Sequence, residues 1–455
     1  MTRAGRQRAT ALALCALAAL AGPAVARPLA DVVDDYVREG LAANLALRSQ
    51  GFDVERAVAA LDAARAGWLP TLALDARYTR SEGGREFTLP LSQIDPALED
   101  ETIAFLRERE QDSRVSVTQP LYAPAIPATV RAQRAQLAAN EYARLALARR
   151  LQRDITVGYL DWLRATKTVA IVDASRSLLA ENLRVNDSLY RNGKVTQDQV
   201  LRARAELLEV EQQLRETRNL AQQARSWLNF LLNRPLDTAL EPADIDAVAA
   251  RSAAELATLE ARALDARPEL AQADSAAREA EARIDVARAA LKPTLGLGID
   301  GGIQGEDYGS GHGYNYAQAS LRISWKLFDG GASRAAVRGA RALAQRTATQ
   351  RDELAQQIRL EVQQALDRLE TAADSLATAE ARAEAARAGF RIAARKRDEG
   401  VISQVEFIDA RSTLTGAELN LNITRFALLA RQADLDYATA AGVLPADPLT
   451  TGSLP

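Results

Sequence analysis

The sequence has 455 residues, of which 47% are hydrophobic and 26% are charged, and its formal net charge is −3. This length exceeds the usual size of one globular domain, so the chain must be multi-domain, repetitive or elongated. Basic and acidic residues are interspersed without a clustered basic face, which argues against a nucleic-acid partner.

Residues 1–26 have the three-part layout of a secretory signal peptide. Arg3, Arg6 and Arg8 precede an apolar run, and a small-residue site ends at Ala26. The run has about half of the roughly 20 residues that a spanning helix needs, so an uncleaved anchor fits less well. We expect cleavage after Ala26.

Cys15 is the single cysteine and lies in this apolar run. Leu14 precedes it where a lipoprotein signal has a small residue, so we expect no lipid anchor. The mature chain then has no disulfide and a net charge of 54 − 60 = −6. Folding or oligomerisation must supply its stability in an oxidising compartment. No later segment has 18 uninterrupted apolar residues, so any membrane insertion must use strands.

Helical patterns cover about residues 31–67 and about residues 253–290. Each is expected to stop one or two residues before a proline, Pro70 or Pro293, because proline disfavours the α conformation in the residue before it. A strand is expected after each proline. A second strand returns, so each half of the chain supplies two strands.

The predicted strands have one apolar and one polar face. Residues 71–80, TLALDARYTR, and about residues 317–327 alternate between apolar and polar side chains. This period of two is expected where the faces of a sheet meet different solvents. If the strands lie in a membrane, the residues that face lipid are Leu72, Leu74, Tyr78, Leu321, Ile323 and Trp325.

The chain contains an internal repeat. GKVTQDQVLRAR from Gly193 aligns with GVISQVEFIDAR from Gly400 at an offset of 400 − 193 = 207. ARAGWLPTLAL from Ala64 aligns with ARAALKPTLGL from Ala287 at an offset of 223. Because 223 − 207 = 16, the first copy carries an insertion, which we place in a long loop at residues 75–114.

Long helical patterns follow the strands in both halves. Each has about 65 residues and ends near a glycine, Gly193 or Gly400. At 1.5 Å per residue each is roughly 100 Å long, which favours solvent-exposed coiled-coil partners over core helices. Shorter helices return to Asn233 and to about Ala441, so Gly193 and Gly400 mark the tips of two hairpins.

The repeat divides the chain into five segments. We predict a signal peptide at residues 1–26, a first structural repeat at 27–234, a linker at 235–252, a second structural repeat at 253–441 and a disordered tail at 442–455.

Four strands leave two unpaired edges whose backbone groups find no hydrogen-bond partners in hydrocarbon. If the strands lie in a membrane, three chains that form a twelve-stranded barrel would pair these edges.

The repeated element order, the P-T-L strand starts and the G-x-x-[ST]-x-x-[DE] tip at Gly400 to Glu406 resemble the TolC family of outer-membrane efflux channels. The resemblance covers nearly the whole mature chain. It implies a mostly α protein with a small β part, which forms a homotrimer with a transmembrane β-barrel and a long coiled-coil tunnel.

The resemblance also implies the partners. The trimer would contact outer-membrane lipid and extend through the periplasm, where an adaptor (membrane fusion) protein opens it. An inner-membrane pump of the RND or ABC type would supply the energy. The channel itself would then be the passive exit duct of a tripartite efflux pump or of a type I secretion system, and drugs, metals and proteins all stay open as cargo.

Glu406 and Asp409 match the acidic residues that ring the periplasmic constriction in members of this family. They lie three residues apart at the start of a helix and hence on one face. In a threefold ring they would favour cations. The alternative is two solvated carboxylates near a helix N-terminus, where the helix dipole stabilises them.

The first repeat departs from the family pattern. Gln199 and Arg202 stand where the second repeat has the two acids, with Asp198 beside them, so a closed gate need not be held by the same polar links. The residues that resemble adaptor-docking tips are Gly193, Lys194, Val195, Gly400, Val401 and Ile402. A glycine that simply ends each helix is the alternative.

Enzymatic function is not expected. Gly296 to Gly301 match a dinucleotide fingerprint, but a loop rather than a helix follows. His312, the single histidine, lies in that loop, and no phosphate-binding G-x-x-x-x-G-K-[ST] motif, cofactor site or metal site is evident.

The main alternative to a channel is a periplasmic adaptor or a structural coiled-coil protein without a pore, although adaptors usually have one hairpin. A sugar- or peptide-specific porin would need more than four strands per chain.

Overall fold

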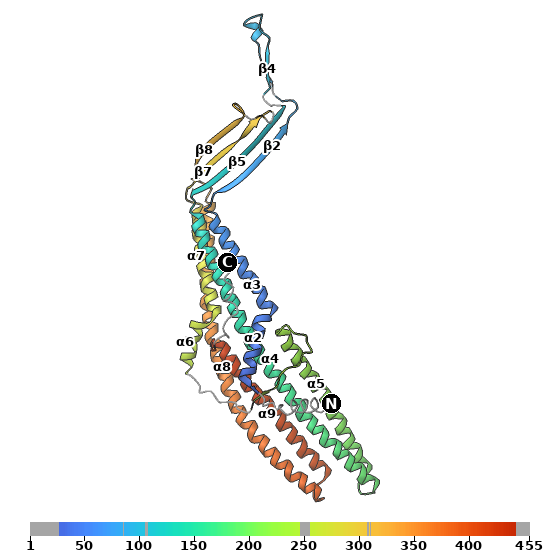
Figure 1. Ribbon diagram of the computed structural model, residues 1–455. Helices are drawn as coiled ribbons and strands as arrows, with labels where there is room; N and C mark the ends of the chain where they lie inside the picture. The colour runs from blue at the N-terminus through green and yellow to red at the C-terminus, as the bar shows by residue number, and fades with distance from the viewer. Residues whose placement is uncertain are drawn as a thin grey trace, which may run out of the picture. The chain divides into compact units, whose positions relative to one another are not determined.

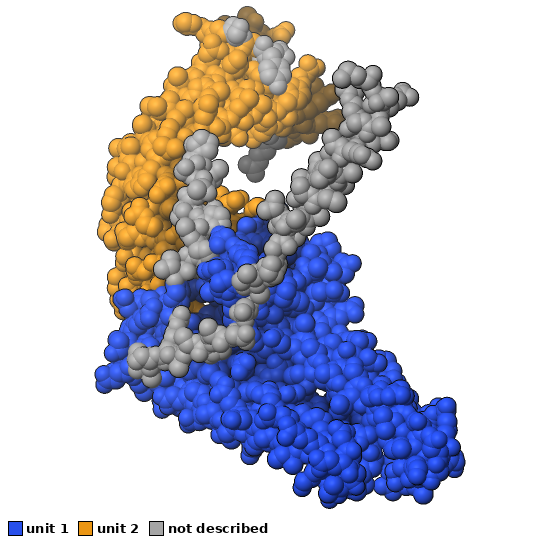
Figure 2. All heavy atoms as spheres, turned by 60° about the horizontal axis from the view of Figure 1, so that its bottom comes forward, with its two compact units in different colours: residues 1–49, 144–268, 355–455 blue, residues 50–143, 269–354 orange. Residues whose placement is uncertain are grey.

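Figure 1 shows the computed structural model, which describes residues 27–84, 86–104, 108–245, 255–306, 309 and 311–442. The predicted signal peptide, residues 246–252 of the predicted linker and residues 443–455 of the predicted tail lie outside these residues. The chain forms two compact units, which Figure 2 colours separately. Unit 1 comprises residues 1–49, 144–268 and 355–455, and unit 2 comprises residues 50–143 and 269–354.

The helices follow the same order in both halves of the chain. They are α2 (Leu29–Ala43), α3 (Leu45–Ala66), α4 (Ala125–Arg191), α5 (Gln197–Leu231), α6 (Leu256–Ala266), α7 (Pro268–Ala289), α8 (Ala332–Asp398) and α9 (Gln404–Ala438). The corresponding helices α4 and α8 each have 67 residues, and α5 and α9 each have 35. None of the helices in the described part of the chain combines the length and the apolar character needed to cross a membrane.

The strands are β1 (Arg27–Pro28), β2 (Thr71–Arg80), β3 (Glu86–Leu89), β4 (Glu101–Ala104), β5 (Arg109–Tyr122), β6 (Ala243–Asp244), β7 (Thr294–Gly305) and β8 (Asn315–Ser324). The antiparallel sheet β2-β5-β7-β8 is the largest, and the pairs β1-β6 and β3-β4 are separate. The predicted fold class, mostly helical with a small sheet, is therefore confirmed.

The helix predicted for about residues 31–67 is in fact two helices, because Asn44 ends α2 and caps α3. Its Oδ1 accepts hydrogen bonds from the backbone N–H groups of Ala46 at 3.0 Å and Leu47 at 3.1 Å. Its Nδ2 donates to the carbonyl oxygen of Leu231 at 2.9 Å, which fixes the break against the end of α5. Asparagine is a favoured N-cap residue for this reason.

The second half has the same break, although its sequence is different there. Arg267 adopts an extended conformation after α6, and Pro268 begins α7. Proline is well suited to the first position of a helix, because its missing N–H has no partner there in any residue. The helix predicted for about residues 253–290 is therefore also two helices.

The loop predicted for residues 75–114 is strand at both ends. Asp75 pairs with Arg114 and Arg80 pairs with Arg109, so β2 matches the strand predicted for residues 71–80 and β5 begins before the predicted end of the loop. Between them the chain forms the small β3-β4 hairpin. The predicted loop bounds were wrong at these ends, whereas the predicted strand was right, because the alternation of side chains continues there with charged residues on the polar face.

The register of the four-stranded sheet separates an apolar face from a polar face. Leu72 pairs with Val117, and Leu297 pairs with Leu321, so these side chains share one face. The other face contains charged side chains such as Arg114, whose Nε lies 3.8 Å from Asp75 Oδ2. Five of the six residues predicted to face lipid lie on the apolar face, namely Leu72, Leu74, Tyr78, Leu321 and Ile323.

Trp325, the sixth residue, lies just beyond the end of β8. Its indole Nε1 donates a hydrogen bond to the carbonyl oxygen of Leu291 at 3.2 Å. Trp325 therefore belongs to the edge of the sheet that leads into the helices, and it is not part of the strand face.

The main core of unit 1 is built around Tyr159 of α4, which is fully buried. Its hydroxyl donates to the carbonyl oxygen of Glu241 at 2.7 Å, and the hydroxyl of Tyr36 accepts from the Glu241 N–H at 2.9 Å. Burial raises the pKa of the Tyr159 hydroxyl, so it stays a neutral donor. Two tyrosines from separate helices thus hold the start of the linker against the helices.

A close strand contact generates a test of the sheet. A Cβ atom added at Gly302 would lie 2.5 Å from the carbonyl oxygen of Ser113 and 2.9 Å from the Cα atom of Arg114. We expect Gly302→Ala to lower the free energy of unfolding by about 1–3 kcal/mol, because the backbone of β5 would have to shift. Gly301→Ala is the matched control, because its Cβ would meet one atom at 3.9 Å, a carbonyl oxygen of Tyr316. Equal melting temperatures by circular dichroism for the two variants would contradict this packing.

Candidate functional site: the hairpin tips and the polar links between the hairpins

The first hairpin tip turns at Gly193, which has a φ of +68°. Its N–H donates to the carbonyl oxygen of Tyr190 at 2.9 Å, and the N–H of Lys194 donates to that of Leu189 at 2.9 Å. This pair of bonds is a Schellman motif, which ends a helix with a residue in the left-handed conformation. Glycine is therefore favoured at the tip, because it adopts this conformation without the steric cost of a Cβ atom.

The second tip repeats this geometry. Gly400 has a φ of +72°, its N–H donates to Arg397 at 2.9 Å, and the N–H of Val401 donates to Lys396 at 2.8 Å. Of the residues predicted to dock an adaptor, Gly193, Lys194, Gly400 and Val401 are exposed, whereas Val195 and Ile402 are half-buried.

The two tips differ at the start of the returning helix. Ser403 caps α9, because its Oγ accepts from the N–H of Glu406, whose carboxylate in turn accepts from the Ser403 N–H at 2.8 Å. This reciprocal pair is a capping box. Thr196 occupies the same place before α5, and its side chain makes no such bond. The predicted gate residue Glu406 thus also stabilises its own helix.

The predicted gate residues are all at the tips but do not form one cluster within the chain. Glu406 and Asp409 are exposed in the first turns of α9. In the first repeat, Arg202 Nε lies 3.9 Å from Asp198 Oδ2 on the same helix face, and Gln199 is half-buried beside them. The first tip therefore carries an internal ion pair where the second carries two acids.

A buried polar link between the two hairpins was missed by the sequence analysis. Arg397 of α8 and Gln404 of α9 both donate to the Oδ1 atom of Asn182 on α4, Gln404 at 3.1 Å. The guanidinium carbon of Arg397 also lies 4.0 Å from the centroid of the Phe407 ring. Burial lowers the pKa of Arg397, whose charge is compensated here by an amide oxygen and an aromatic face.

A second link lies about two turns along the same helices. Arg411 of α9 is 7% exposed, and it donates to Ser175 Oγ of α4 at 2.6 Å and to Glu206 Oε2 of α5 at 3.3 Å. Burial lowers the pKa of the Arg411 guanidinium, although Glu206 opposes this shift. One side chain of the second hairpin is thus bonded to both helices of the first.

A sequence signal for these links exists in α4. Its buried residues Val172, Ser175, Leu179, Asn182 and Asn186 are spaced by three and four, the pattern of a coiled-coil seam. Polar residues at such positions specify the partner and its register, at some cost in stability. Searching the apolar stripe for polar interruptions would have found Ser175 and Asn182.

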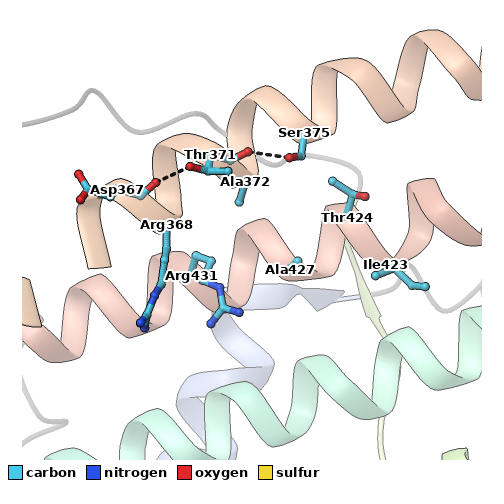
Figure 3. A pocket seen from close by; sticks show the side chains of 9 residues that line it. All are labelled: Asp367, Arg368, Thr371, Ala372, Ser375, Ile423, Thr424, Ala427 and Arg431. Atoms are coloured by element: carbon cyan, nitrogen blue, oxygen red, sulfur yellow. Dashed lines mark hydrogen bonds between the residues drawn. The ribbon is translucent and has the colours of Figure 1, made fainter. Parts of the chain in front are cut away.

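A groove with a hollow of about 440 Å³ runs between α8 and α9, as Figure 3 shows. The hydroxyls of Thr371 and Ser375 donate to carbonyl oxygens one turn earlier in α8, at 2.8 Å and 2.7 Å. Ala372 and Ala427 also line it, so the middle of the groove consists of small side chains that allow a further helix to approach.

Among the described residues, no group of three or more histidine, cysteine or acidic side chains is placed to hold a metal ion.

The repeat supplies a matched test of the second link. We expect Arg411→Ala to lower the free energy of unfolding by about 1.5–3 kcal/mol, because it leaves Ser175 and Glu206 without their cationic partner. Arg204 occupies the equivalent position in the first repeat and is exposed. Arg204→Ala should change stability by less than about 0.5 kcal/mol. Equal losses in thermal or denaturant unfolding would show that Arg411 makes no special contribution.

Comparison with known proteins agrees with this geometry. The family model for outer membrane efflux proteins matches residues 37–234 and 259–441. No curated protein matches the sequence.

Solved structures show the same fold. The outer membrane channel CmeC of Campylobacter jejuni superposes with a TM-score of 0.78 at 18% identity, covering 91% of this chain and 86% of that one. The outer membrane protein VceC of Vibrio cholerae gives 0.75 at 18% identity, covering 91% and 97%. The open state of the Neisseria gonorrhoeae MtrE outer membrane channel gives 0.75 at 19% identity, covering 91% and 90%.

The family model covers both repeats, with their hairpins and their strands. The fold shared with these channels confirms the TolC resemblance drawn from the tip motifs and the strand starts. The chain therefore belongs to the family of outer membrane efflux proteins, channel proteins whose place is the outer membrane.

Proposed function

We propose that this protein is the passive exit duct of a tripartite efflux pump or of a type I secretion system, and that it works as a homotrimer. The observation that carries the proposal is the two-faced sheet, whose outer strands each pair on one side only within the described part of the chain. Leu72 and Leu74 are each 74% exposed and Ile323 is 71% exposed, on the outer strands β2 and β8. Apolar strands with free edges need both lipid and further strands around them.

Three copies of the sheet give the twelve strands of a closed barrel. Its apolar face would then contact outer-membrane lipid, and its polar face, with Asp75, Arg114 and Asp300, would line a water-filled lumen. The long hairpins would form a helical tunnel in the periplasm. The tunnel would provide a path for the cargo but no energy for its transport. An inner-membrane pump of the RND or ABC type is the proposed source of that energy.

The six hairpin tips of the trimer are the proposed gate and docking surface. A periplasmic adaptor protein would meet the exposed tips at Gly193 and Gly400. Glu406 and Asp409 would form rings of acidic groups that favour cations, since a threefold axis brings like charges together. Asp198, Gln199 and Arg202 of the first repeat would lie next to these rings.

The polar links set the strength of the closed state in this proposal. Arg397 and Arg411 bind the second hairpin to the first within one chain. If a hairpin moves outward, these bonds must break. The buried cations of Arg397 and Arg411 would then become exposed or lose their hydrogen-bond partners. The closed state can therefore be held without an acidic partner at Gln199 or Arg202.

Planar-bilayer conductance tests the channel and its acidic rings. We expect the wild type to give small, cation-selective steps, and the double variant Glu406→Gln, Asp409→Asn to lose the selectivity. Glutamine can also serve in a capping box, so the helix start is preserved while the charge is removed. Glu370→Gln with Asp374→Asn, two exposed acids on α8 far from the tip, is the control for net charge.

Each result of this conductance experiment has a distinct meaning. Selectivity that persists in the tip variant would reject the acidic rings and keep the channel. Failure of every variant to insert would reject the channel and favour the adaptor or structural alternative.

The latch role of the first link has its own test. We expect Arg397→Ala to raise the single-channel conductance severalfold, because α8 loses its bond to Asn182 and only the Gln404 bond of α9 remains there. Arg395→Ala is the matched control, since Arg395 is an exposed arginine two residues earlier on α8. If a folded Arg397→Ala protein conducts like the wild type, the link has a purely structural role.

A further inference from the structure

A small cavity in unit 2 lies where the sheet meets the helices. It has a volume of about 280 Å³ and is walled by the end of α3, the end of β5, the start of α4 and the end of α7. Its lining residues are Trp68, Tyr122, Ala123, Pro124, Pro127, Ala128, Arg131, Asp285, Arg288 and Lys292. Neither the gate nor the hairpin links use this cavity.

The cavity carries a positive charge. Asp285 of α7 accepts from Arg131 at 2.9 Å and from Arg288 at 3.2 Å, so one carboxylate is shared by two guanidinium groups. Lys292 forms no ion pair with the described part of the chain. Three cations and one anion leave a net charge of about +2 facing the cavity, which suits an anion such as a phosphate.

The surroundings of the cavity are apolar and exposed. Trp68 is 38% exposed, Tyr122 is 46% exposed, and the indole of Trp325 is fixed to the backbone at Leu291 next to Lys292. Tryptophan and tyrosine are enriched where a membrane meets water. The further large apolar side chains exposed along this edge are Leu69, Leu121, Leu291, Leu327 and Phe328.

We propose that this cavity binds the phosphate of an anionic phospholipid headgroup from the periplasmic leaflet of the outer membrane. Arg288 and Lys292 would contact the phosphate, with Arg131 kept in place by Asp285, while the exposed apolar residues contact the acyl chains. A free phosphate ion would use the cations and leave this apolar surface in water. The inference rests on the proposed placement of the sheet in the membrane.

Comparison of the two repeats shows that the equivalent positions of the other repeat lack one of the cations of this cavity. At the offset of 223, Asp285, Arg288 and Lys292 correspond to Asp62, Arg65 and Leu69. Asp62 and Arg65 form the same ion pair at 3.0 Å, but a leucine replaces the lysine. Arg131 corresponds to Arg338 at the offset of 207. The cation that distinguishes the cavity is therefore Lys292.

Lipid titration of the full-length protein in detergent, followed by native mass spectrometry, tests the site. We expect phosphatidylglycerol to bind the wild type, and Arg288→Ala, Lys292→Ala to weaken it roughly 25-fold, at about fivefold per cation. Lys292→Gln alone should weaken it about fivefold. The matched control, Arg65→Ala with Arg338→Ala, removes two cations from the equivalent positions and should bind like the wild type.

Three results would overturn the proposal. Equal phosphatidylglycerol binding by wild type and by folded Lys292→Gln would show that the cations do not contact the lipid. Equal binding of phosphatidylcholine would show that only the acyl chains are recognised. Thermal stabilisation of the wild type by inorganic phosphate alone, matching that by phosphatidylglycerol, would identify a free-anion site. Conductance of the same variants reports on the channel separately, because binding in detergent does not need a pore.

Discussion

The open edges of the four-stranded sheet are the constraint on which the rest of the molecule depends. Within the described residues, β2 and β8 each pair on one side only. Their remaining backbone groups need partners once the sheet leaves water, and each such group left unsatisfied costs several kcal/mol, on the order of 2–7. In the proposed trimer, pairing with neighbouring chains would meet this need. The sheet would then be complete only when the three chains come together.

The long hairpins face a different difficulty, which is register. Two helices of 67 residues with a narrow apolar seam can slide past each other by one heptad at little cost. Asn182 and Arg411 remove this freedom, because their hydrogen bonds to the opposite hairpin form in one alignment only. Buried polar groups of this kind add little net stability and much specificity in coiled coils. Asn182 and Arg411 lie near the hairpin tips. The contacts that fix the register are therefore close to the part of the hairpins that we propose to open.

The sequence predicted the parts of this fold that depend on local chemistry. The strand at residues 71–80 follows from its alternation, and the tips at Gly193 and Gly400 follow from the glycine that a left-handed turn favours. The break at Asn44 was missed because the bond that fixes it against α5, from Asn44 to the carbonyl oxygen of Leu231, joins residues 187 positions apart in the sequence. The Arg397 link was missed for a similar reason, since its acceptor lies 215 positions away in the sequence.

The unequal capping of the two returning helices has a consequence for how the tips move. The first turn of α9 is closed by two reciprocal bonds between Ser403 and Glu406, whereas α5 begins at Thr196 without a side-chain cap. Amide hydrogens at the start of α5 should therefore exchange with solvent faster than those of α9. In a trimer, rigid and fraying tips would alternate around the ring. A partner with six identical subunits would then meet two inequivalent kinds of hairpin tip. Its subunits could not all bind in the same way.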